Sequence, residues 1–343
     1  MFLWIALVGV FLLSFLISRR MATLQGSTLL DRPVARSAHT VATPRGGGFA
    51  IVVAISLWLV VLSLTGFVSV SDLQVLLCAI PVAVAGFIDD LRGLPVRMRL
   101  PVHLFAAIAA LSLLGPLPEP FFSGWLLLPE FVQSGLLVLA LVWLLNLYNF
   151  MDGIDTLAAA QCLFVSGAAG VFLAGQQAGL AWVCAGLFAA TSGFLLLNLP
   201  PAKLFMGDIG STFLGFFIGL IALISHYQQS LSVWVWVLLM GAFIADTTYT
   251  LIVRVIAGQK LTEGHSTHAY QRLARRYGQH KPVVLAYMAV NVLWLFPIAW
   301  LAVIYPEYGV LFAISGIVPL MLVAGLIGAG KTSDHGKSAN NNR

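Results

Sequence analysis

Long apolar stretches follow one another along almost the whole of this 343-residue chain, and they restrict its fold more than any other feature. Hydrophobic residues make up 60% of the chain and charged residues only 9%. A soluble protein of this length carries about a quarter charged residues. The stretches are continuous and show no period-two alternation, so they predict transmembrane helices and exclude a barrel of strands. The sequence therefore predicts an all-α, polytopic membrane protein.

The apolar stretches predict a bundle of about eleven transmembrane helices, or ten if one of the shorter ones does not cross. The first stretch has no basic residue before it, and Arg19 and Arg20 follow it. This is the reverse of the order in a signal peptide, so we interpret it as a retained span with its N-terminus outside. Pro81 and Pro297 predict kinks within their spans. The predicted spans lie at about 2–17, 48–68, 73–88, 101–115, 131–148, 157–175, 179–199, 211–226, 231–252, 283–304 and 308–329.

The basic residues determine the predicted orientation. With the N-terminus outside, all 18 Lys and Arg residues fall on the cytoplasmic side, which satisfies the positive-inside rule and places the C-terminus in the cytoplasm. The net charge of +5 then forms a basic face suited to an anionic lipid or substrate. The predicted organisation is one membrane domain over residues 1–330 and a flexible cytoplasmic tail over 331–343. Its cytoplasmic active-site loops are predicted at about 18–47, 89–100, 149–156, 199–210 and 253–282.

A polar segment, NLYNFMDGIDTLA over residues 146–158, interrupts the apolar pattern between two spans. Asn146, Asn149, Asp152 and Asp155 would each be costly if buried unpaired in hydrocarbon. Side chains three residues apart share one face of a helix, so the two pairs predict a polar stripe at the membrane surface. The segment resembles part of a calcium loop but lacks the further ligands of an EF-hand. We interpret it as a site for hydrated Mg²⁺ or for a nucleotide.

Further acids lie at predicted helix ends. Asp89 and Asp90 are at the C-terminal end of a predicted span, where the helix dipole favours cations, so Mg²⁺ or a basic partner would stabilise them. The alternative is a solvated helix end beside Arg92. Asp208 precedes another span, where capping of the helix alone would explain it. Asp246 lies inside a predicted span, which makes it a candidate functional residue.

Two basic motifs accompany these acids. In the run PRGGG, Arg45 can pair with a phosphate, and glycines such as Gly47 let backbone amides approach one; the alternative is a flexible turn. In EGHSTHAYQRL, His265, His268 and Arg272 suit phosphate or nucleotide contact. The histidines are too few for a zinc site, and the alternative is a basic amphipathic segment on anionic lipid. The three cysteines have no metal-site spacing and predict buried thiols.

The joint placement of these motifs indicates more than any one of them. Acids come from three predicted loops on one side of the membrane, and basic residues come from two others. Carboxylates can hold a metal ion, while cations and glycine amides can bind phosphate oxygens. The sequence therefore predicts Mg²⁺-assisted phosphoryl transfer.

The set of motifs resembles the polyprenyl-phosphate N-acetylhexosamine-1-phosphate transferase superfamily, whose members are MraY-, WecA- and WbpL-like. The match is carried by TPRGGG, GFIDD, NLYNFMDGIDTLA, FMGDIGSTFLG and EGHSTHAYQRL, in the family's order over about 31–276. The last of these motifs is most similar to the WbpL-type enzymes that initiate O-antigen synthesis. One departure follows the paired acids, where MraY-like members have a lysine and this chain offers Arg97 or Arg99.

The resemblance implies an enzyme of the bacterial inner membrane with its active site on the cytoplasmic face. It implies transfer of an N-acetylhexosamine 1-phosphate from a UDP-sugar to undecaprenyl phosphate, release of UMP, and initiation of O-antigen or a related surface polysaccharide. The N-acetylated fucosamine, quinovosamine and glucosamine sugars remain alternatives, as does UDP-MurNAc-pentapeptide for peptidoglycan. A secondary transporter is the alternative from another class, but transporter sites lie near helix centres, whereas these polar residues lie at one surface.

The resemblance also assigns roles: the residue matching Asp208 binds Mg²⁺, those matching Asp89 and Asp90 contact the lipid phosphate, and Asn149, Asp152 and Asp155 match the nucleotide and metal region. The second pKa of a phosphate monoester is about 6, so the lipid phosphate is largely ionised at neutral pH. We therefore favour direct attack, with Asp89 or Asp90 orienting the nucleophile. A covalent aspartyl-phosphate is the alternative.

The complete prediction for the site follows from these motifs and the resemblance. The expected cofactor is Mg²⁺, or Mn²⁺ in its place. The expected partners are a UDP-N-acetylhexosamine, undecaprenyl phosphate and the lipid bilayer, without nucleic acid, and a homodimer is left open. The predicted residues are catalytic Asp89, Asp90 and Asp208; metal-binding Asp208 and Asp152; and substrate-binding Arg45, Gly47, Asn149, Asp152, Asp155, Asn198, His265, His268 and Arg272.

Overall fold

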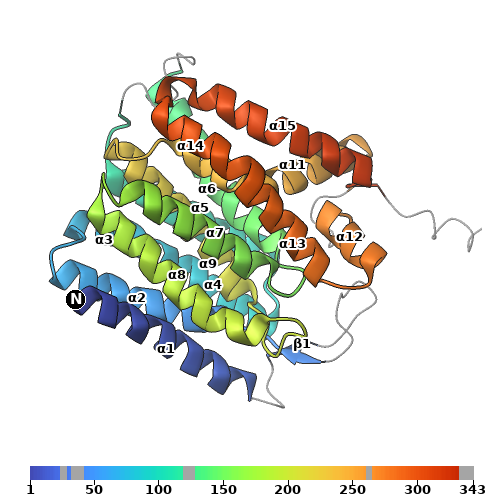
Figure 1. Cartoon of the computed structure of the whole chain (residues 1–343), viewed down its shortest axis with the longest axis horizontal. Coiled ribbons are helices and arrows are strands. Elements are labelled where there is room, and N and C mark those ends of the chain that lie inside the picture. The colour runs from blue at the N-terminus through green and yellow to red at the C-terminus, as the bar shows by residue number, and fades with distance from the viewer. Residues whose placement is uncertain (24–28, 32–41, 119–127, 260–264, 332–343) are drawn as a thin grey trace, which may run out of the picture.

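Helices dominate the computed structural model, which describes residues 1–23, 29–31, 42–118, 128–259 and 265–331. They pack side by side in one bundle, and a two-stranded ribbon and a short helix, α12, lie at one end of it (Figure 1). The bounds are α1 Phe2–Ala22, β1 Leu30–Asp31, β2 Thr43–Pro44, α2 Gly48–Leu64, α3 Val70–Leu77, α4 Ala79–Arg92, α5 Val96–Leu114, α6 Glu130–Phe150, α7 Leu157–Leu173, α8 Ala178–Asn198, α9 Asp208–Tyr227, α10 Val233–Leu239, α11 Gly241–Ile256, α12 Ala269–Tyr277, α13 Lys281–Val290, η1 Asn291–Leu295, α14 Phe296–Ile304, η2 Pro306–Tyr308 and α15 Gly309–Ile327.

The predicted all-α membrane class is confirmed. Within the described ranges, eight helices are long and apolar enough to cross a membrane. A ninth candidate is the pair α10 and α11, whose two halves meet at 76°. The apolar helices α2 and α7 have 17 residues each and are shorter than these. Every predicted apolar stretch is helical over most of its length, but the count of eleven spans and the sides on which the two termini lie remain predictions.

Prolines explain two interruptions within long helical segments. Pro81 has no N–H to donate to the carbonyl of Leu77, and the helix is interrupted there, between α3 and α4. Pro297 follows the π-helical turn η1, which separates α13 from α14. Proline has no N–H to donate, so the regular α-helical hydrogen bonding cannot continue through Pro297, and the π turn lies just before it. The α-helical pattern is therefore interrupted near both prolines, while the kinks themselves remain predictions, because Val70–Arg92 and Lys281–Ile304 each count as one candidate span.

Helix α9 forms the centre of the bundle and positions its polar end. In its most apolar window, 94% of the residues are buried, against 22% for α1 and 17% for the segment that includes α15. Helices α4, α6 and α2 pack around it. The outer helices instead present large apolar side chains such as Trp4, Phe105 and Leu326, as expected for a lipid-facing surface. The first residue of α9 is Asp208, so this packing fixes the position of one predicted site residue.

The close approach of α2 to α9 requires glycine. A methyl carbon added to Gly48 would lie 2.1 Å from the Cα of Gly210, which is backbone and cannot rotate away. The amide of Gly48 donates to the carbonyl of Met206 at 2.8 Å, which fixes the two segments together just before α9 begins. The three cysteines are free; Cys162 and Cys184 are buried as predicted, whereas Cys78 is only partly buried.

We expect Gly48→Ala to destabilise the protein by about 1–3 kcal/mol, because an added methyl group overpacks a contact between two backbones. The measurement is the thermal unfolding midpoint in detergent. Gly9→Ala is the matched control, since a Cβ at Gly9 in α1 meets no atom within 4 Å. Equal midpoints for the two variants would contradict the packing described for α2 and α9.

Candidate active site

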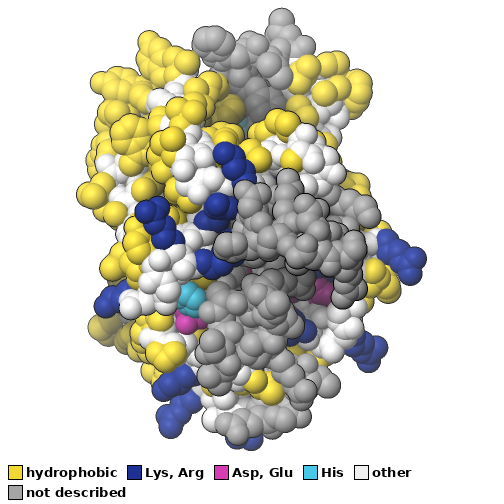
Figure 2. Space-filling view, turned by 90° about the vertical axis from the view of Figure 1, so that its right-hand side faces the viewer, with side chains coloured by type: hydrophobic (Ala, Val, Ile, Leu, Met, Phe, Trp, Pro, Cys, Tyr) yellow, Lys and Arg dark blue, Asp and Glu magenta, His cyan; other side chains and the backbone are white. Residues whose placement is uncertain are grey.

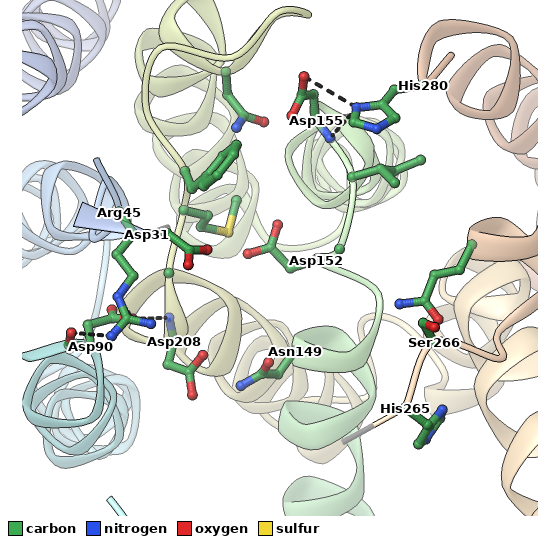
Figure 3. Close-up of a pocket in the computed structure, with 17 residues that line it drawn as sticks. Asp31, Arg45, Asp90, Asn149, Asp152, Asp155, Asp208, His265, Ser266 and His280 are labelled. Atoms are coloured by element: carbon green, nitrogen blue, oxygen red, sulfur yellow. Dashed lines mark hydrogen bonds and ion pairs between the residues drawn. The ribbon is translucent and has the colours of Figure 1, made fainter. Parts of the chain in front are cut away.

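A cavity of about 280 Å³ lies at the end of the bundle where α6 ends and α9 begins (Figure 3). It is lined mainly by polar side chains. Eight of the twelve predicted site residues contribute to it, although they come from segments far apart in the sequence. The lining residues are Asp31, Arg45, Asp90, Asn149, Asp152, Gly153, Ile154, Asp155, Asn198, Phe205, Met206, Gly207, Asp208, His265, Ser266, Gln271 and His280.

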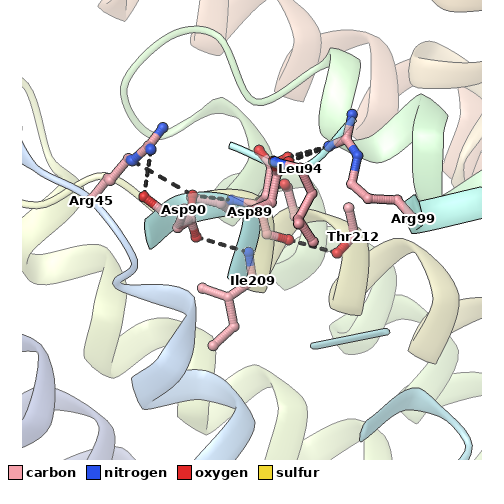
Figure 4. A network of polar contacts seen from close by, with 10 residues as sticks. Arg45, Asp89, Asp90, Leu94, Arg99, Ile209 and Thr212 are labelled. Atoms are coloured by element: carbon pink, nitrogen blue, oxygen red, sulfur yellow. Dashed lines mark hydrogen bonds and ion pairs between the residues drawn. The ribbon is translucent and has the colours of Figure 1, made fainter. Parts of the chain in front are cut away.

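Asp90 joins the end of α4 to the start of α9. Its carboxylate accepts hydrogen bonds from the amides of Asp208 at 3.0 Å and Ile209 at 3.1 Å. The carboxylate also lies 3.8 Å from Nε of Arg45, and the Asp90 side chain is only 1% exposed (Figure 4). The first amides of a helix have no partner within the helix, and its dipole favours a negative charge there. The conflict expected for an acid at the end of α4 is thus resolved by the N-terminus of α9.

Arg99 bridges two of the predicted catalytic acids. Its Nη1 lies 2.8 Å from Oδ2 of Asp208 and also binds Asp89, which in turn accepts from the amide of Leu94 (Figure 4). Arg97 is exposed, so of the two arginines that follow the paired acids, Arg99 is the one beside them. Asp89 itself does not line the cavity, but it lies next to Asp208 through this shared guanidinium.

Within the described residues, the side chains of Asp152 and Asn149 have no hydrogen-bond partner, unlike those of Asp90, Asp155 and Asn198 in the same cavity. Both point toward the side of the cavity where Asp208 lies (Figure 3). Burial raises the pKa of Asp152 well above its usual value, and the nearby charges of Asp208, Asp90 and Asp155 raise it further. A carboxyl group that resists ionisation in such a setting is stabilised as an anion by a bound cation.

Asp155 is held by groups from two distant segments. Its Oδ2 accepts from the amide of Ala202 at 3.1 Å and lies 3.3 Å from Nδ1 of His280, and its own amide is directed at the same imidazole nitrogen. His280 lines the cavity but was not among the predicted residues. No spacing in the sequence indicates it, because it lies 125 residues from Asp155 and outside every motif.

Asn198 connects the 151–156 loop to the loop before α9. Its Oδ1 accepts from the amide of Thr156 at 2.8 Å, and its Nδ2 donates to the carbonyl of Leu204 at 3.0 Å. Thr156 has φ of 74°, a left-handed conformation that is unfavourable for a β-branched residue. Such strain is maintained only where surrounding contacts impose it. Asn198 therefore lines the cavity, but its amide is committed to shaping the loop.

His265 lines the cavity as a neutral group. Burial lowers its pKa to about 4, with further lowering by the nearby charges of His268 and Arg254. At neutral pH the imidazole therefore has no positive charge for a phosphate. Its Nδ1 lies 3.1 Å from the hydroxyl of Thr267, and the ring faces Phe150 and His268. It is suited to hydrogen bonding or stacking rather than to ion pairing.

Three of the predicted substrate-binding residues lie outside the cavity lining. The amide of Gly47 already donates to the carbonyl of Phe205 at 2.9 Å, so this amide joins two protein segments. His268 is almost completely buried, with Nδ1 3.5 Å from Asp246. The guanidinium of Arg272 donates to the carbonyl of Ile327, the last residue of α15, and to that of Lys331 beyond it. The structure therefore places these residues where they support the walls of the cavity.

The oxygen atoms of the cavity could supply some of the ligands of a divalent cation, with substrate phosphates supplying others. Among the residues with described positions, no three His, Cys, Asp or Glu side chains form a group able to hold a metal ion by themselves. Mg²⁺ commonly uses only one or two carboxylates and takes its other ligands from water and substrate phosphates. Asp152, Asn149 and Asp208 supply hard oxygen donors at the cavity, and the first two have no other partner in the described chain, so these residues can hold Mg²⁺.

The fold and the cavity together define a polytopic membrane protein with an acidic, phosphate-compatible site at one end of an apolar bundle. The family described as Glycosyl transferase family 4 matches residues 73–226. Among curated relatives, the probable undecaprenyl-phosphate N-acetylglucosaminyl 1-phosphate transferase of Bacillus subtilis is 29% identical over 276 residues, covering 77% of this chain and 75% of the relative.

Two further relatives extend this comparison. A phospho-N-acetylmuramoyl-pentapeptide-transferase of Campylobacter jejuni is 31% identical over 245 residues, covering 62% of this chain and 67% of the relative. The undecaprenyl-phosphate alpha-N-acetylglucosaminyl 1-phosphate transferase of Thermotoga maritima is 25% identical over 291 residues, covering 82% and 84%. The chain belongs to this family, the polyprenyl-phosphate N-acetylhexosamine-1-phosphate transferase superfamily, which confirms the resemblance found from the motifs.

We expect Asn198→Ala to lower stability by about 1–3 kcal/mol, because the buried amide of Thr156 loses its acceptor. The measurement is the thermal unfolding midpoint of the purified protein. Ser192→Ala is a control on the same helix, since the Ser192 hydroxyl bonds only within α8. An unchanged midpoint for Asn198→Ala would mean that the loop does not rely on this side chain.

Proposed function

We propose that this protein transfers an N-acetylhexosamine 1-phosphate from a UDP-sugar to undecaprenyl phosphate and releases UMP. The observation that carries the proposal is the cavity itself. In a protein of this family, Arg45, Asp90, Asp152 and Asp208 from four separate segments meet at the polar end of an otherwise apolar bundle. The lipid-linked sugar would then initiate O-antigen or a related surface polysaccharide.

The charge distribution supports an active site on the cytoplasmic face of the bacterial inner membrane. Figure 2 shows Lys and Arg side chains spread over the cavity end of the bundle, with acidic and histidine side chains between them. At the opposite ends of the helices, the described residues include the acids Asp72, Glu130 and Glu307. Basic residues accumulate on the cytoplasmic side of membrane proteins, so the cavity would open toward cytoplasmic UDP-sugar.

In the proposed reaction, an oxygen of the lipid phosphate attacks the β-phosphorus of the UDP-sugar. A new P–O bond forms there, and the bond from the β-phosphorus to the bridging oxygen breaks. UMP leaves with that oxygen and its electron pair. The lipid phosphate is already largely ionised at neutral pH, so no proton has to be removed by a strong base.

The contacts of Asp89 and Asp90 favour a role in positioning arginine side chains over a role as a base that accepts a proton. Asp90 is occupied by two amides of α9 and by Arg45, so it holds that cation beside the cavity. Asp89 shares Arg99 with Asp208 in the same way. Arg45 and Arg99 can pair with phosphate oxygens. The alternative in which an aspartate forms a covalent phosphoenzyme would require one of these carboxylates to leave its partners.

Asp208 and Asp152, with the amide oxygen of Asn149, would hold the divalent cation. When bound, Mg²⁺ offsets the negative charge that builds up on the diphosphate and on the departing UMP. Mn²⁺ accepts the same oxygen ligands. The Asp208 carboxylate contacts Arg99 through Oδ2 and also contacts Asp89, so cation binding would compete with these partners.

The relatives leave two candidate sugar donors. Enzymes named for N-acetylglucosaminyl transfer align over about three quarters or more of this chain, and those named for phospho-N-acetylmuramoyl-pentapeptide transfer align over less of it. This coverage favours an N-acetylhexosamine over the muramoyl-pentapeptide. Family membership also favours the transferase over the secondary transporter.

We expect the purified protein to release UMP from at least one UDP-N-acetylhexosamine when undecaprenyl phosphate and Mg²⁺ are present. A panel of UDP-N-acetylglucosamine, -fucosamine and -quinovosamine, with UDP-MurNAc-pentapeptide, identifies the donor. Omission of the lipid and chelation of divalent cations are the controls, and both should stop UMP release. Absence of UMP with every donor would refute the proposed function.

We expect Asp208→Asn to reduce turnover by at least about a hundredfold, because it removes a negative charge from the transition-state environment with little change in shape. Initial rates of UMP release against Mg²⁺ concentration measure the effect. Asp72→Asn is the matched control, since Asp72 lies in the first turn of α3 at the opposite end of the bundle. Undiminished Mg²⁺-dependent turnover in Asp208→Asn would place the metal elsewhere.

A further inference from the structure

Asp246 is an acid inside α11, which with α10 forms a candidate membrane span, and the proposed reaction gives it no role. It lies on α11, just after the 76° bend, and is only 2% exposed. Its carboxylate accepts hydrogen bonds from the amides of Ala269 at 2.8 Å and Tyr270 at 3.0 Å, and from the hydroxyl of Tyr287 at 2.6 Å. The Asp246 carboxylate is therefore already bound by three protein groups.

These contacts fix the start of helix α12. Ala269 and Tyr270 are its first two residues, whose amides have no partner within the helix. A carboxylate satisfies both amides and also interacts favourably with the positive end of the helix dipole. The helix has only nine residues and is otherwise strongly amphipathic, so a short segment of this kind relies on tertiary contacts for its position.

Tyr270 connects α12 to the loop that carries Asp152. The tyrosine is completely buried, and its hydroxyl donates to the carbonyl of Phe150 at 2.8 Å. The same hydroxyl lies against Gly153, where an added Cβ would be only 2.1 Å away. Tyr270 thus contacts the chain on both sides of Asp152.

Asp152 gains its position from the loop rather than from its own contacts. Within the described residues its carboxylate has no hydrogen-bond partner, so the backbone around it determines where the oxygens lie. Asn198 holds the far end of this loop through Thr156, and Tyr270 holds the near end. A site that binds charge efficiently has its charged groups held in place before the ligand arrives.

We propose that Asp246 and Tyr270 are positioning residues for Asp152. The buried acid fixes the first turn of α12, and α12 fixes the near end of the Asp152 loop through the Tyr270 hydroxyl. The inference rests on one part of the proposed function, namely that Asp152 contacts the nucleotide or its metal ion. It assigns the intramembrane acid to the architecture of the active site rather than to an ion pathway.

The experiment is a double-mutant cycle between Gly153→Ala and Tyr270→Phe. Gly153→Ala alone should lower both the unfolding midpoint and the rate of UMP release, because the new methyl group meets the tyrosine hydroxyl. Tyr270→Phe alone removes one hydrogen bond and should raise the KM for the UDP-sugar by about fivefold. The double variant should regain much of what Gly153→Ala loses, since the nearest remaining ring carbon lies 3.2 Å from the added Cβ.

Tyr277→Phe is the matched control, because Tyr277 is on the same helix and is 58% exposed. Combined with Gly153→Ala it should restore neither stability nor activity. Purely additive effects of Gly153→Ala and Tyr270→Phe on the unfolding midpoint would overturn the inference. This readout requires no substrate, so it remains decisive even if wild-type protein releases no UMP and the proposed function fails.

Asp246→Asn tests the first link of the chain. It should raise the KM for the UDP-sugar by about tenfold and leave the KM for undecaprenyl phosphate unchanged, because α12 and the Asp152 loop shift together. If the substitution only destabilised the protein, less folded enzyme would be present. The maximal rate would then fall, and the KM values for the UDP-sugar and for undecaprenyl phosphate would both stay unchanged. An unchanged KM for the UDP-sugar in folded Asp246→Asn would refute the role assigned to this acid.

Discussion

The binding of Asp90 to the first amides of α9 is the contact on which the cavity is built. Helix α9 is the most buried element of the bundle, so its polar N-terminus must find a partner within the protein. Asp90 supplies that partner from the end of α4. The same contact places Asp208 at the cavity and keeps Arg45 beside it. One capping interaction therefore determines where three charged side chains of the site meet.

The acids at this end of the bundle fall into two groups. Asp90, Asp155 and Asp246 accept hydrogen bonds from backbone amides of other segments, and they hold the bundle end together. Asp152 has no such partner among the described residues and points into the cavity. Burying a carboxylate is costly unless it is bound, so an unbound one beside three other acids is the group best suited to a ligand.

The sequence predicted the class of fold and most of the site because both leave local signals. Continuous apolar stretches indicate helices, and the motif around Asp152 indicates polar groups at a helix end. His280 left no such signal, because its contact with Asp155 depends on how α13 packs against the loop. His268 and Arg272 were predicted to bind substrate from their type and spacing. Both contact protein groups that sequence spacing does not reveal, and their roles in substrate binding remain predictions.

By itself, the sequence determined the membrane class, the helical stretches and the family, because hydropathy and short motifs are properties of neighbouring residues. Only the tertiary structure decided which of two arginines joins Asp89 to Asp208, and that Asp90 and Asp155 are bound by amides of other segments whereas Asp152 is not. It also decided that Asp246 accepts hydrogen bonds from the first two amides of α12. The physical reason is that a carboxylate takes its role from the donors around it, and here these donors come from segments far away in the chain.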